Sequence, residues 1–434
     1  MSTQSTKKAW GDDVFPLLSW FETQKVREAK VMVVGAGALG NEVIKNLALF
    51  GVGYLVIVDF DTIEYGNLTR SVLFRPADAD KGCYKAKVAA LRIKEINPDI
   101  HVLPVCGHLA TGAGLGIYRR MDLVIGCLDS LEARVALNRI CFRAGKTWID
   151  GGIGDLEGLV SVYQPGKSCY ECNLTADEKA GISKRTSCAG IVQMNEQFGR
   201  TATTPVMASL VGAVQVQEAM KFIHPDAIEA GVFTTLAGRL FVYEGKHPSA
   251  DIYDFHSGCP IHNNDCSAYE YWNPVVEVPA LSADTTVLQA LSLIKQALSV
   301  DTVEINMRND KFVDRIVPRE DNTNASREDN GFVAGKDNTN TPREDNGIFS
   351  PMLPASQIPD YIRNDETLRN RQIAEGFYQH EIENIDDTFP YSSLTLRQIG
   401  IPYFDVMQVS TPKGLFYVEL SQDIQKYEEY SFAC

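Results

Sequence analysis

The stretch Val31-Met-Val-Val-Gly-Ala-Gly-Ala-Leu-Gly40 decides the fold. Four apolar, mostly β-branched residues lead into three glycines in a G-x-G-x-x-G pattern, which is typical of a strand followed by a tight turn. Over residues 42–50 apolar side chains recur at helical spacing, and residues 54–58 form a second buried-type strand that ends at Asp59. Strand, turn, helix and strand predict one βαβ unit with its crossover.

The same alternation continues along the first half of the chain. Buried-type strands are predicted at 101–105, 122–126 and 147–150, with helices at 85–96 and 131–144. This order predicts a Rossmann-like, doubly wound α/β domain with a mostly parallel sheet covered on both faces. A further helix is predicted at 205–222, and strands at 231–234 and 239–243 are expected to pair across a turn.

Length and composition limit the class of protein. The 434 residues suggest more than one domain. Acidic residues number 56 and basic residues 41, giving a net charge of −15, which argues against a nucleic-acid partner. We also expect no membrane association, because no apolar run approaches the roughly 20 residues of a membrane span and the N-terminus lacks a secretion signal. Ten cysteines then indicate reduced thiols and metal ligands in a cytoplasmic protein.

The pattern of predicted helices and strands changes past residue 271. A helix at 286–298, with strands at 276–278, 302–307 and 415–420, predicts a smaller α+β domain. Between the strands predicted at 302–307 and 415–420, the tetrapeptide Arg-Glu-Asp-Asn begins at Arg319, Arg327 and Arg343. A related tripeptide, Lys-Asp-Asn, begins at Lys336. This polar tract predicts a flexible insertion at about 318–347. We therefore expect domains at 1–270 and 271–434.

Gly35, Gly37 and Gly40 predict a nucleotide site. Glycines let the backbone approach phosphate oxygens, and amides at the helix N-terminus face the anion. Asp59 ends the next strand, where a carboxylate can accept both ribose hydroxyls of an adenosine. The alternative is a glycine-rich turn kept for packing, which leaves Asp59 unexplained.

Charged residues near the same edge of the sheet indicate which chemistry the nucleotide undergoes. Cations that converge on phosphates, together with a metal, stabilise attack at phosphorus, whereas hydride transfer does not need them. Asp129 ends another predicted strand and is a candidate magnesium ligand. The other candidates follow the second strand or open the next helix, namely Asp61, Asn67, Arg70 and Lys85.

Cysteines predict a metal site. Cys169-Tyr-Glu-Cys172 has the spacing that seats two thiolates on one zinc ion. Cys259-Pro-Ile-His262 offers a second half, with Cys266 as an alternative fourth ligand. The other interpretation is two buried thiols and a loop histidine.

Cys188 is a separate candidate. Helical and strand periodicity is lost from about 169 to 204, which predicts a long irregular crossover. A nucleophilic thiol needs exposure and nearby cations, and Lys184, Arg185 and Arg200 are close in sequence. The alternative is an unreactive loop cysteine.

Four motifs together resemble a known family. They are VMVVGAGALGNEVIKNLALFGVG (31–53), VDFDTIEYGNLTRSVLF (58–74), DKGCYKAKVA (80–89) and CLDSLEAR (127–134). They are similar to the ThiF/MoeB/ubiquitin-activating superfamily, and most to the catalytic, thioester-forming subunits of enzymes that activate ubiquitin-like modifiers. The resemblance covers about 31–222.

The resemblance implies that ATP adenylates the C-terminal carboxylate of a ubiquitin-like protein. Asp59 would hold the ribose, Asn67, Arg70 and Lys85 the phosphates, and Asp129 the Mg²⁺. Cys188 would then form a thioester and pass the modifier to a conjugating enzyme. The zinc half-sites would clamp the crossover.

The resemblance also implies a dimer, either homodimer or heterodimer, and a β-grasp, ubiquitin-fold C-terminal domain. Adenylating homodimers of the family supply an arginine from an N-terminal segment to the neighbouring active site. In the corresponding stretch of this chain, residues 15–30, the one arginine is Arg27. Bacterial ubiquitin-like systems, some of which act in antiviral defence, are one expected context. Three alternatives stay open: an adenylate-only enzyme for a sulfur carrier, an NAD-dependent oxidoreductase and a non-catalytic scaffold.

Overall fold

A computed structural model describes residues 10–110, 112–175, 203–255, 266, 271–307, 313–316, 378–381, 384–389, 392–397, 399 and 401–420. The chain divides into two compact units. The first contains Met1–Ala110, Ile117–Trp272 and Gln425–Cys434, and the second contains Thr111–Gly116 and Asn273–Ile424. Cys188, Cys259, His262 and the repeat tract lie outside the described residues.

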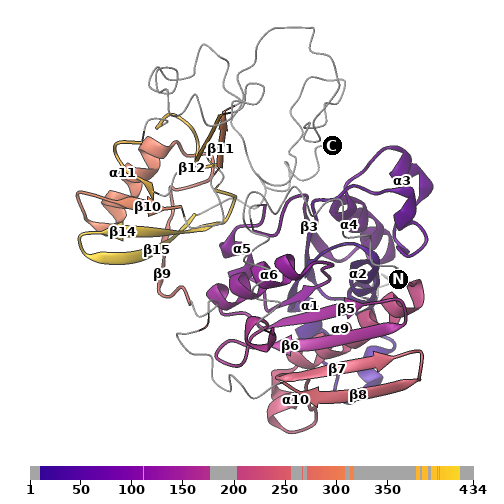
Figure 1. Ribbon diagram of the computed structural model, residues 1–434. Helices are drawn as coiled ribbons and strands as arrows, with labels where there is room; N and C mark the ends of the chain where they lie inside the picture. The colour runs from indigo at the N-terminus through magenta and orange to yellow at the C-terminus, as the bar shows by residue number, and fades with distance from the viewer. Residues whose placement is uncertain are drawn as a thin grey trace, which may run out of the picture. The chain divides into compact units, whose positions relative to one another are not determined.

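The first unit is built on an eight-stranded sheet of order β3-β2-β1-β4-β5-β6-β7-β8. Figure 1 labels β3 and the strands from β5 to β8 of this sheet. Its first five strands run parallel, with Val31 of β1 paired to both Leu55 and Leu123. The last three strands add on antiparallel. The strands are β1 (Lys30–Val34), β2 (Tyr54–Val58), β3 (His101–Val105), β4 (Leu123–Gly126), β5 (Trp148–Ile153), β6 (Glu157–Tyr163), β7 (Arg239–Glu244) and β8 (Ser249–Asp254).

Helices cover this sheet as the alternating pattern predicts. Helix α2 (Ala38–Phe50) packs against α4 (Lys85–Ile96) and α9 (Pro205–Ile223), whereas α6 (Leu131–Ala144) contacts β4 and β5. Strand order reverses between β1 and β4, so right-handed crossovers place α6 on the face opposite α2. The Rossmann-like α/β class is therefore confirmed. Ligands of such sheets bind where the strand order reverses.

The N-terminal segment closes one end of the core. It contains a 3₁₀ turn η1 (Phe15–Leu17) and helix α1 (Thr23–Glu28). The Phe15 and Phe21 rings lie 4.7 Å apart and both stack near Phe50 at the end of α2. Buried His224 accepts the Glu22 backbone N–H at Nε2, at 2.9 Å. Aromatic burial and this hydrogen bond fix the segment on α2 and α9.

One strand prediction is wrong. Residues 231–234 form no strand, because Val232 and Phe233 donate their backbone N–H groups to Ala227 O at 2.9 and 3.3 Å. These amides close the turn after α10 (Pro225–Glu229) and are unavailable to a ladder. The predicted partner strand, β7, pairs instead with β6 and β8.

The second unit contains a five-stranded sheet of order β13-β10-β14-β15-β9. Helix α11 (Val287–Leu298) packs against β9, buries Val287, Leu291 and Ile294, and has Thr286 as its N-cap. The first and last strands, β9 and β15, run parallel. The strands are β9 (Val275–Val278), β10 (Glu304–Asn306), β13 (Asn384–Ile385), β14 (Val406–Thr411) and β15 (Gly414–Leu420).

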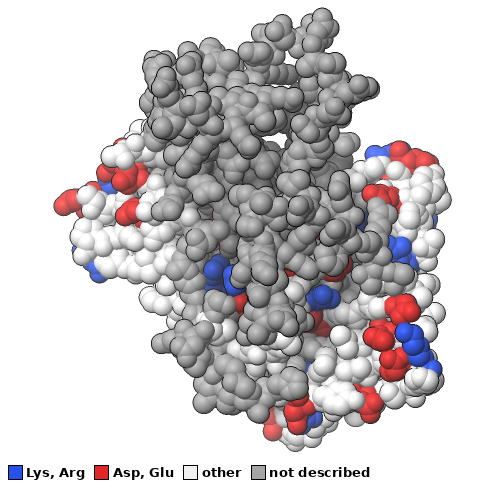
Figure 2. Space-filling model, in the orientation of Figure 1, with Lys and Arg blue, Asp and Glu red and all other residues white. Residues whose placement is uncertain are grey.

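Shorter elements complete the described chain. Strands β11 (Val313–Ile316) and β12 (Tyr378–Glu381) pair antiparallel and lie on either side of the repeat tract in sequence. The others are η2 (Tyr65–Asn67), α3 (Pro76–Asp80), α5 (Leu115–Arg119) and η3 (Glu171–Asn173). None of the helices among the described residues has the length and apolar character needed to cross a membrane. On the face drawn in Figure 2, small groups of Lys and Arg are interspersed with Asp and Glu.

Candidate functional site

The glycine loop joins β1 to α2 at the point where the strand order reverses. Gly35 has a φ of +96°, and a Cβ there would stand 2.3 Å from Cys127 O. Gly37 is the N-cap of α2. Among the described residues no side chain caps this helix end, and no atom other than those of its chain neighbours lies within 4 Å of a Cβ built on Gly37. The first amides of α2 therefore face an open space that suits an anion.

Asp59 lies beside this loop at the end of β2. Its carboxylate accepts the Ala36 N–H at 2.6 Å and the Asp61 N–H at 2.8 Å. Burial raises the pKa of Asp59 to about 6, although the positive charge of Lys85 opposes this shift. The carboxylate is thus fixed next to the loop, where it can also accept hydroxyl groups of a sugar.

Asp61, whose N–H binds Asp59, forms an ion pair with Lys85. The Lys85 Nζ lies 2.7 Å from Asp61 Oδ2, and the Lys85 backbone N–H donates to Asp61 O at 2.9 Å. Lys85 begins α4 and is 9% exposed, so its cation is held close to the site and largely shielded from water. A buried ammonium held this way can be directed at a phosphate group.

Asn67 and Arg70 lie in the loop after β2. Asn67 Oδ1 accepts the Glu64 N–H at 2.9 Å, which closes the turn η2. The Arg70 guanidinium donates one N–H to Gly66 O at 2.7 Å. These contacts order the loop that carries both side chains.

Asp129 follows β4 and is exposed. The next residue, Ser130, caps α6 by accepting the Ala133 N–H at 3.2 Å. Arg134, one turn into α6, donates to Leu128 O at 2.7 Å and pairs with Asp150 of β5 at 3.2 Å. Arg134 therefore holds the backbone directly before Asp129. An exposed carboxylate oxygen on an ordered loop is a suitable Mg²⁺ ligand.

The structure joins some of the predicted residues by direct contacts. Asp59, Asp61 and Lys85 form one hydrogen-bonded group with the glycine loop. Gly35 lies against Cys127, two residues before Asp129, so the β4 end reaches the same loop. Asn67 and Arg70 make their described bonds within their own loop.

Arg27 is held within its own chain. Its guanidinium donates to Trp10 O at 2.9 Å and pairs with Asp12. Because both contacts lie in the N-terminal segment, Arg27 orders that segment.

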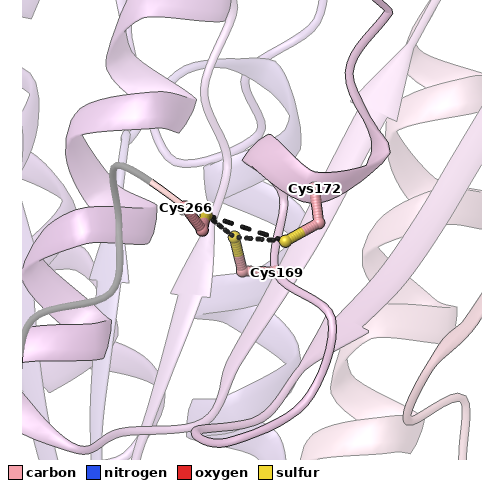
Figure 3. A group of neighbouring side chains, drawn as sticks. All are labelled: Cys169, Cys172 and Cys266. Atoms are coloured by element: carbon pink, nitrogen blue, oxygen red, sulfur yellow. Dashed lines mark hydrogen bonds between the residues drawn. The ribbon is translucent and has the colours of Figure 1, made fainter. Parts of the chain in front are cut away.

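Three cysteines form a compact cluster in the first unit (Figure 3). The Sγ atoms of Cys169, Cys172 and Cys266 lie 3.6, 3.7 and 3.7 Å apart. Thiolates about 2.3 Å from a tetrahedral zinc ion would lie about 3.8 Å from one another, so the three side chains fit zinc. The two thiol neighbours and burial raise the pKa of Cys169, so metal binding must displace protons.

Polar contacts fix the loop that carries this cluster. Asn173 Nδ2 donates to Cys169 O at 2.8 Å, and Asn138 of α6 accepts the Tyr170 N–H at 3.1 Å. Arg139 binds Glu171 through two nitrogens, at 2.9 and 2.8 Å. Such surrounding hydrogen bonds orient metal ligands.

Sequence reasoning missed four polar residues at the glycine loop and the neighbouring strand ends, three of them buried. Asn41 and Gln215 occupy fully buried helical positions, and a polar residue within an apolar helical pattern was the available signal. Gln215 Nε2 donates to Gly126 O at 2.9 Å and to Ile149 O at 3.3 Å, which ties α9 to the ends of β4 and β5. The other two are Arg134 and Asp150, whose partners are distant in sequence.

Known proteins with sequences similar to this chain belong to one family. Residues 8–268 match the ThiF family. The SAMP-activating enzyme E1 of Haloferax volcanii is 30% identical over 239 residues, covering 55% of this chain and 81% of that protein. The molybdopterin-synthase adenylyltransferase of Escherichia coli is 30% identical over 230 residues, covering 51% and 81%.

For other similar proteins the match covers a smaller share of their length. Ubiquitin-like modifier-activating enzyme 5 of Dictyostelium discoideum is 29% identical over 216 residues, covering 46% of this chain and 54% of that protein, so the chain spans about half of that relative. The crystal structure of E. coli MccB with ATP aligns with a TM-score of 0.45 and 23% identity, over 57% of this chain and 68% of that one. Because the family match extends over more than half of the sequence, the chain belongs to the ThiF family.

Proposed function

We propose that this protein uses ATP to adenylate the C-terminal carboxylate of a ubiquitin-like or sulfur-carrier protein. The observation that carries the proposal is the group formed by the open glycine loop, Asp59 and the Asp61–Lys85 pair. Relatives named as an adenylyltransferase and as activating enzymes of ubiquitin-like modifiers support it.

The proposed ATP pose follows from the donors and acceptors. Asp59 accepts the ribose hydroxyls, and the amides after Gly37 receive the phosphates. Lys85 and Arg70 provide positive charge to the phosphates, and Asn67 provides an amide. Gly35 and Gly40 allow the loop to pack closely enough for this geometry.

In the proposed reaction a carboxylate oxygen of the modifier attacks the α-phosphorus of ATP. The bond to the bridging oxygen breaks, pyrophosphate leaves and an acyl-adenylate remains. No enzyme group becomes bonded in this step, so positioning and charge stabilisation provide the catalysis. Asp129 would hold Mg²⁺, which neutralises charge on the phosphates when it is bound.

A second step is proposed at Cys188. Its thiolate attacks the acyl carbon of the adenylate, AMP leaves, and a thioester forms, from which a conjugating enzyme takes the modifier. The motif resemblance supports this step. The alternative product is a free adenylate used for sulfur transfer, as an adenylate-only enzyme would make.

We also propose a structural zinc ion on Cys169, Cys172 and Cys266. Cys259 or His262 would be its fourth ligand. Zinc would hold the beginning of the 169–204 crossover to the domain. A dimer partner is proposed to supply a further arginine, because Arg27 is bonded within its own N-terminal segment.

Exchange of radiolabelled pyrophosphate into ATP tests the adenylation step. With Mg²⁺ and peptides or proteins that end in candidate tails, the wild type should exchange, and Asp129→Ala should lose this activity. Asp251→Ala, an exposed acid on β8, is the matched control and should remain active. Absence of exchange by a wild type that binds ATP would contradict the proposed function.

The thioester step has its own readout. Cys188→Ala should exchange pyrophosphate normally but lose the adduct that thiol reagents release, whereas Cys106→Ala should keep both. A releasable adduct on Cys188→Ala would exclude this nucleophile. Exchange without any adduct on the wild type would favour the adenylate-only alternative.

A further inference from the structure

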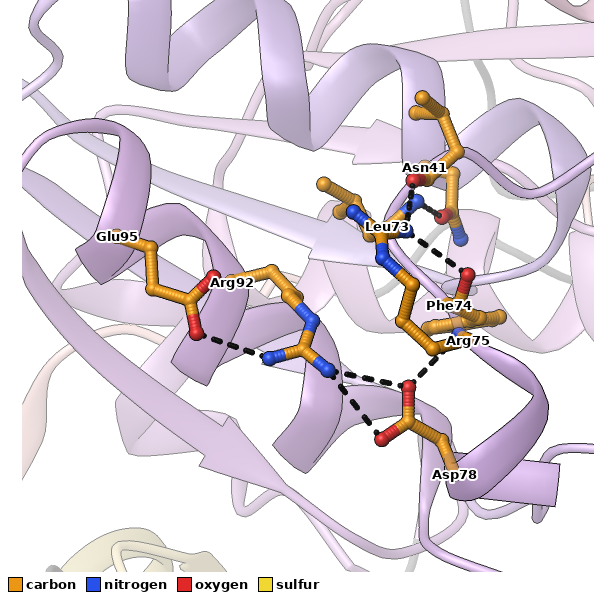
Figure 4. Close-up of polar contacts among 8 residues, drawn as sticks. Asn41, Leu73, Phe74, Arg75, Asp78, Arg92 and Glu95 are labelled. Carbon is orange, nitrogen blue, oxygen red and sulfur yellow. Dashed lines mark hydrogen bonds and ion pairs between the residues drawn. The ribbon is translucent and has the colours of Figure 1, made fainter. Parts of the chain in front are cut away.

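Asn41 has an unusual position for a polar side chain. It follows the third glycine of the loop, lies in the first turn of α2 and is 0% exposed. Its Nδ2 donates to Ala36 O at 2.7 Å and to Gly37 O at 2.9 Å. Its Oδ1 accepts the Leu73 N–H at 2.9 Å. One buried amide thus uses both of its donors and its acceptor to join two separate backbone segments, and Figure 4 shows its contact with Leu73.

The first of these segments is the loop that faces the open anion space. Ala36 is held from both sides, because its N–H donates to Asp59 and its C=O accepts from Asn41. The bond to Asp59 does not involve Asn41, so the Ala36–Gly37 peptide keeps this anchor when Asn41 is changed. It therefore serves as the fixed reference to which Asn41 ties the second segment.

The second segment begins three residues after Arg70. Its backbone is braced internally, because the Arg75 guanidinium donates to Val72 O and Phe74 O, both at 2.9 Å. The Arg75 N–H donates to Asp78 Oδ2 at 2.8 Å, and Asp78 also meets Arg92 at 3.4 Å (Figure 4). These bonds keep the shape of the segment, whose residues Leu73 and Phe74 are also buried in the core. Asn41 adds the bond that ties its first residue, Leu73, to the glycine loop.

Alternative residues at position 41 cannot reproduce these bonds. Asp would point an oxygen at the Ala36 and Gly37 carbonyls, which need a donor. Ala would remove the side-chain partner of the Leu73 N–H and of the Ala36 and Gly37 carbonyls. Loss of hydrogen bonds to buried polar groups lowers the free energy of unfolding. Of Asn, Asp and Ala, only the Asn amide donates toward one segment and accepts from the other.

We propose that Asn41 is a positioning residue that fixes Arg70 relative to the phosphate-binding loop. It touches neither nucleotide nor carboxylate itself. Because reacting groups must be held within a fraction of an ångström, a small displacement of the Arg70 loop has a large effect. The inference deepens the proposed function and rests on it for the identity of the nucleotide, but nucleotide binding alone can test it.

A double-mutant cycle on ATP affinity, measured by calorimetry without any protein tail, is the test. Asn41→Ala should weaken ATP binding on the order of tenfold in the presence of Arg70. In the Arg70→Ala background the same change should cost about twofold or less, because the cation that it positions is already absent. Adenosine, which lacks phosphates, should bind all four proteins with similar affinity.

Asn97→Ala is the matched control. Asn97 is 1% exposed and also bridges backbone groups, donating to Ala48 O at 3.1 Å and accepting the Asp99 N–H at 3.1 Å, but it lies at the opposite end of α4 from Lys85. Asn97→Ala should lower the melting temperature without changing the ratio of ATP affinity to adenosine affinity. If Asn41→Ala does not fold, Asn41→Ser replaces it, because its hydroxyl is too short to join both segments.

If Asn41→Ala lowers ATP affinity equally with and without Arg70, the inference is overturned. A parallel loss of adenosine affinity would also overturn it. A wild type that binds ATP but never exchanges pyrophosphate would contradict the proposed function and leave this cycle fully interpretable. A wild type that binds no ATP would contradict both.

Discussion

Gly40 packs so closely against Gly35 that a Cβ atom on Gly40 would stand 1.9 Å from the Gly35 carbonyl oxygen. The two residues hold the start of α2 against the end of β1. Gly37 between them differs, because within the described part of the chain a Cβ there would meet no atom within 4 Å other than those of its chain neighbours. The three glycines of one motif therefore have two separate roles, helix–strand packing and access for a ligand.

Alanine substitutions should separate these roles. Gly40→Ala must displace backbone and should lower the melting temperature strongly or prevent folding. Gly37→Ala should fold with a melting temperature close to that of wild type but bind ATP on the order of tenfold more weakly, because its methyl group occupies the space for the phosphates. Thermal melts and ATP calorimetry give both values.

Gly154→Ala is the control for this pair, because its Cβ would have ordinary contacts starting at 3.7 Å. It should leave stability and ATP affinity unchanged. ATP affinity of Gly37→Ala equal to that of wild type would show that phosphates do not approach this glycine.

The parallel part of the fold was readable from local patterns. Predicted strands and helices at 101–105, 85–96 and 131–144 match β3, α4 and α6, because buried strands and amphipathic helices leave a period in the sequence. The edge of the sheet was less readable. Residues 231–234 have strand-like composition, yet their amides bond to Ala227.

The site residues also differ in how far local sequence patterns predict them. Asp59, Asp61 and Lys85 could be predicted because they lie beside recognisable strand and helix ends. The partners that position the site could not, since Asn41 meets Leu73 and Arg134 meets Asp150 through tertiary contacts that leave no periodic signal. Cys266 was predicted as an alternative zinc ligand, and its contact with Cys169 across a long separation in sequence leaves no periodic signal.

Nucleotide affinity should depend on pH through Asp59. Its pKa of about 6 lies above the ordinary value of about 3.9, so protonation begins near neutral pH. A protonated carboxyl accepts fewer hydrogen bonds, and adenosine affinity should therefore fall as the pH decreases through about 6. Calorimetry with adenosine avoids titration of the phosphates.

Asp59→Asn is the matched variant for this pH dependence. It should bind adenosine more weakly at pH 8 and lack the decrease near pH 6. The effect on folding has the opposite sign. Because the pKa in the folded state is raised, Asp59 contributes stability that is present below about pH 4 and lost as the pH rises through about 6. An unchanged adenosine pH profile in Asp59→Asn would assign the titration to another group.

The Arg134–Asp150 pair should be stabilising only as a pair. Arg134→Met leaves the Asp150 carboxylate, which is 9% exposed, without its cation and should cost about 3–5 kcal/mol of unfolding free energy. Adding Asp150→Leu should recover much of this loss, because the buried charge is removed. Urea unfolding of the four proteins measures the coupling.

Arg239→Met is the control, since Arg239 pairs with Asp254 at 3.4 Å with side chains 47% and 88% exposed. Exposed pairs contribute at most about 1 kcal/mol. Burial also raises the pKa of Asp150, so the cost of Arg134→Met should shrink as the pH falls and the carboxyl takes up a proton. A cost equal to that of Arg239→Met would show that the pair is effectively solvated.

The cysteine cluster should bind zinc with a stoichiometry of one per chain. Sγ separations of 3.6–3.7 Å already match a tetrahedral thiolate site, so binding requires loss of thiol protons and little rearrangement. Cys172→Ser and Cys266→Ser should each lose most of the metal, as measured by mass spectrometry of the purified protein, and should melt at lower temperature. Cys83→Ser, outside the cluster, should keep its zinc.

Comparison of Cys259→Ala with His262→Ala then identifies the fourth ligand, because only the variant that removes it should lower zinc affinity in a chelator competition. Affinity should also fall at acidic pH in the wild type, since protons compete for the thiolates and the pKa of Cys169 is raised. If Cys266→Ser binds as much zinc as wild type, Cys266 is not a ligand. If the wild type without metal melts at the same temperature as with zinc, the three thiols hold this loop by packing alone.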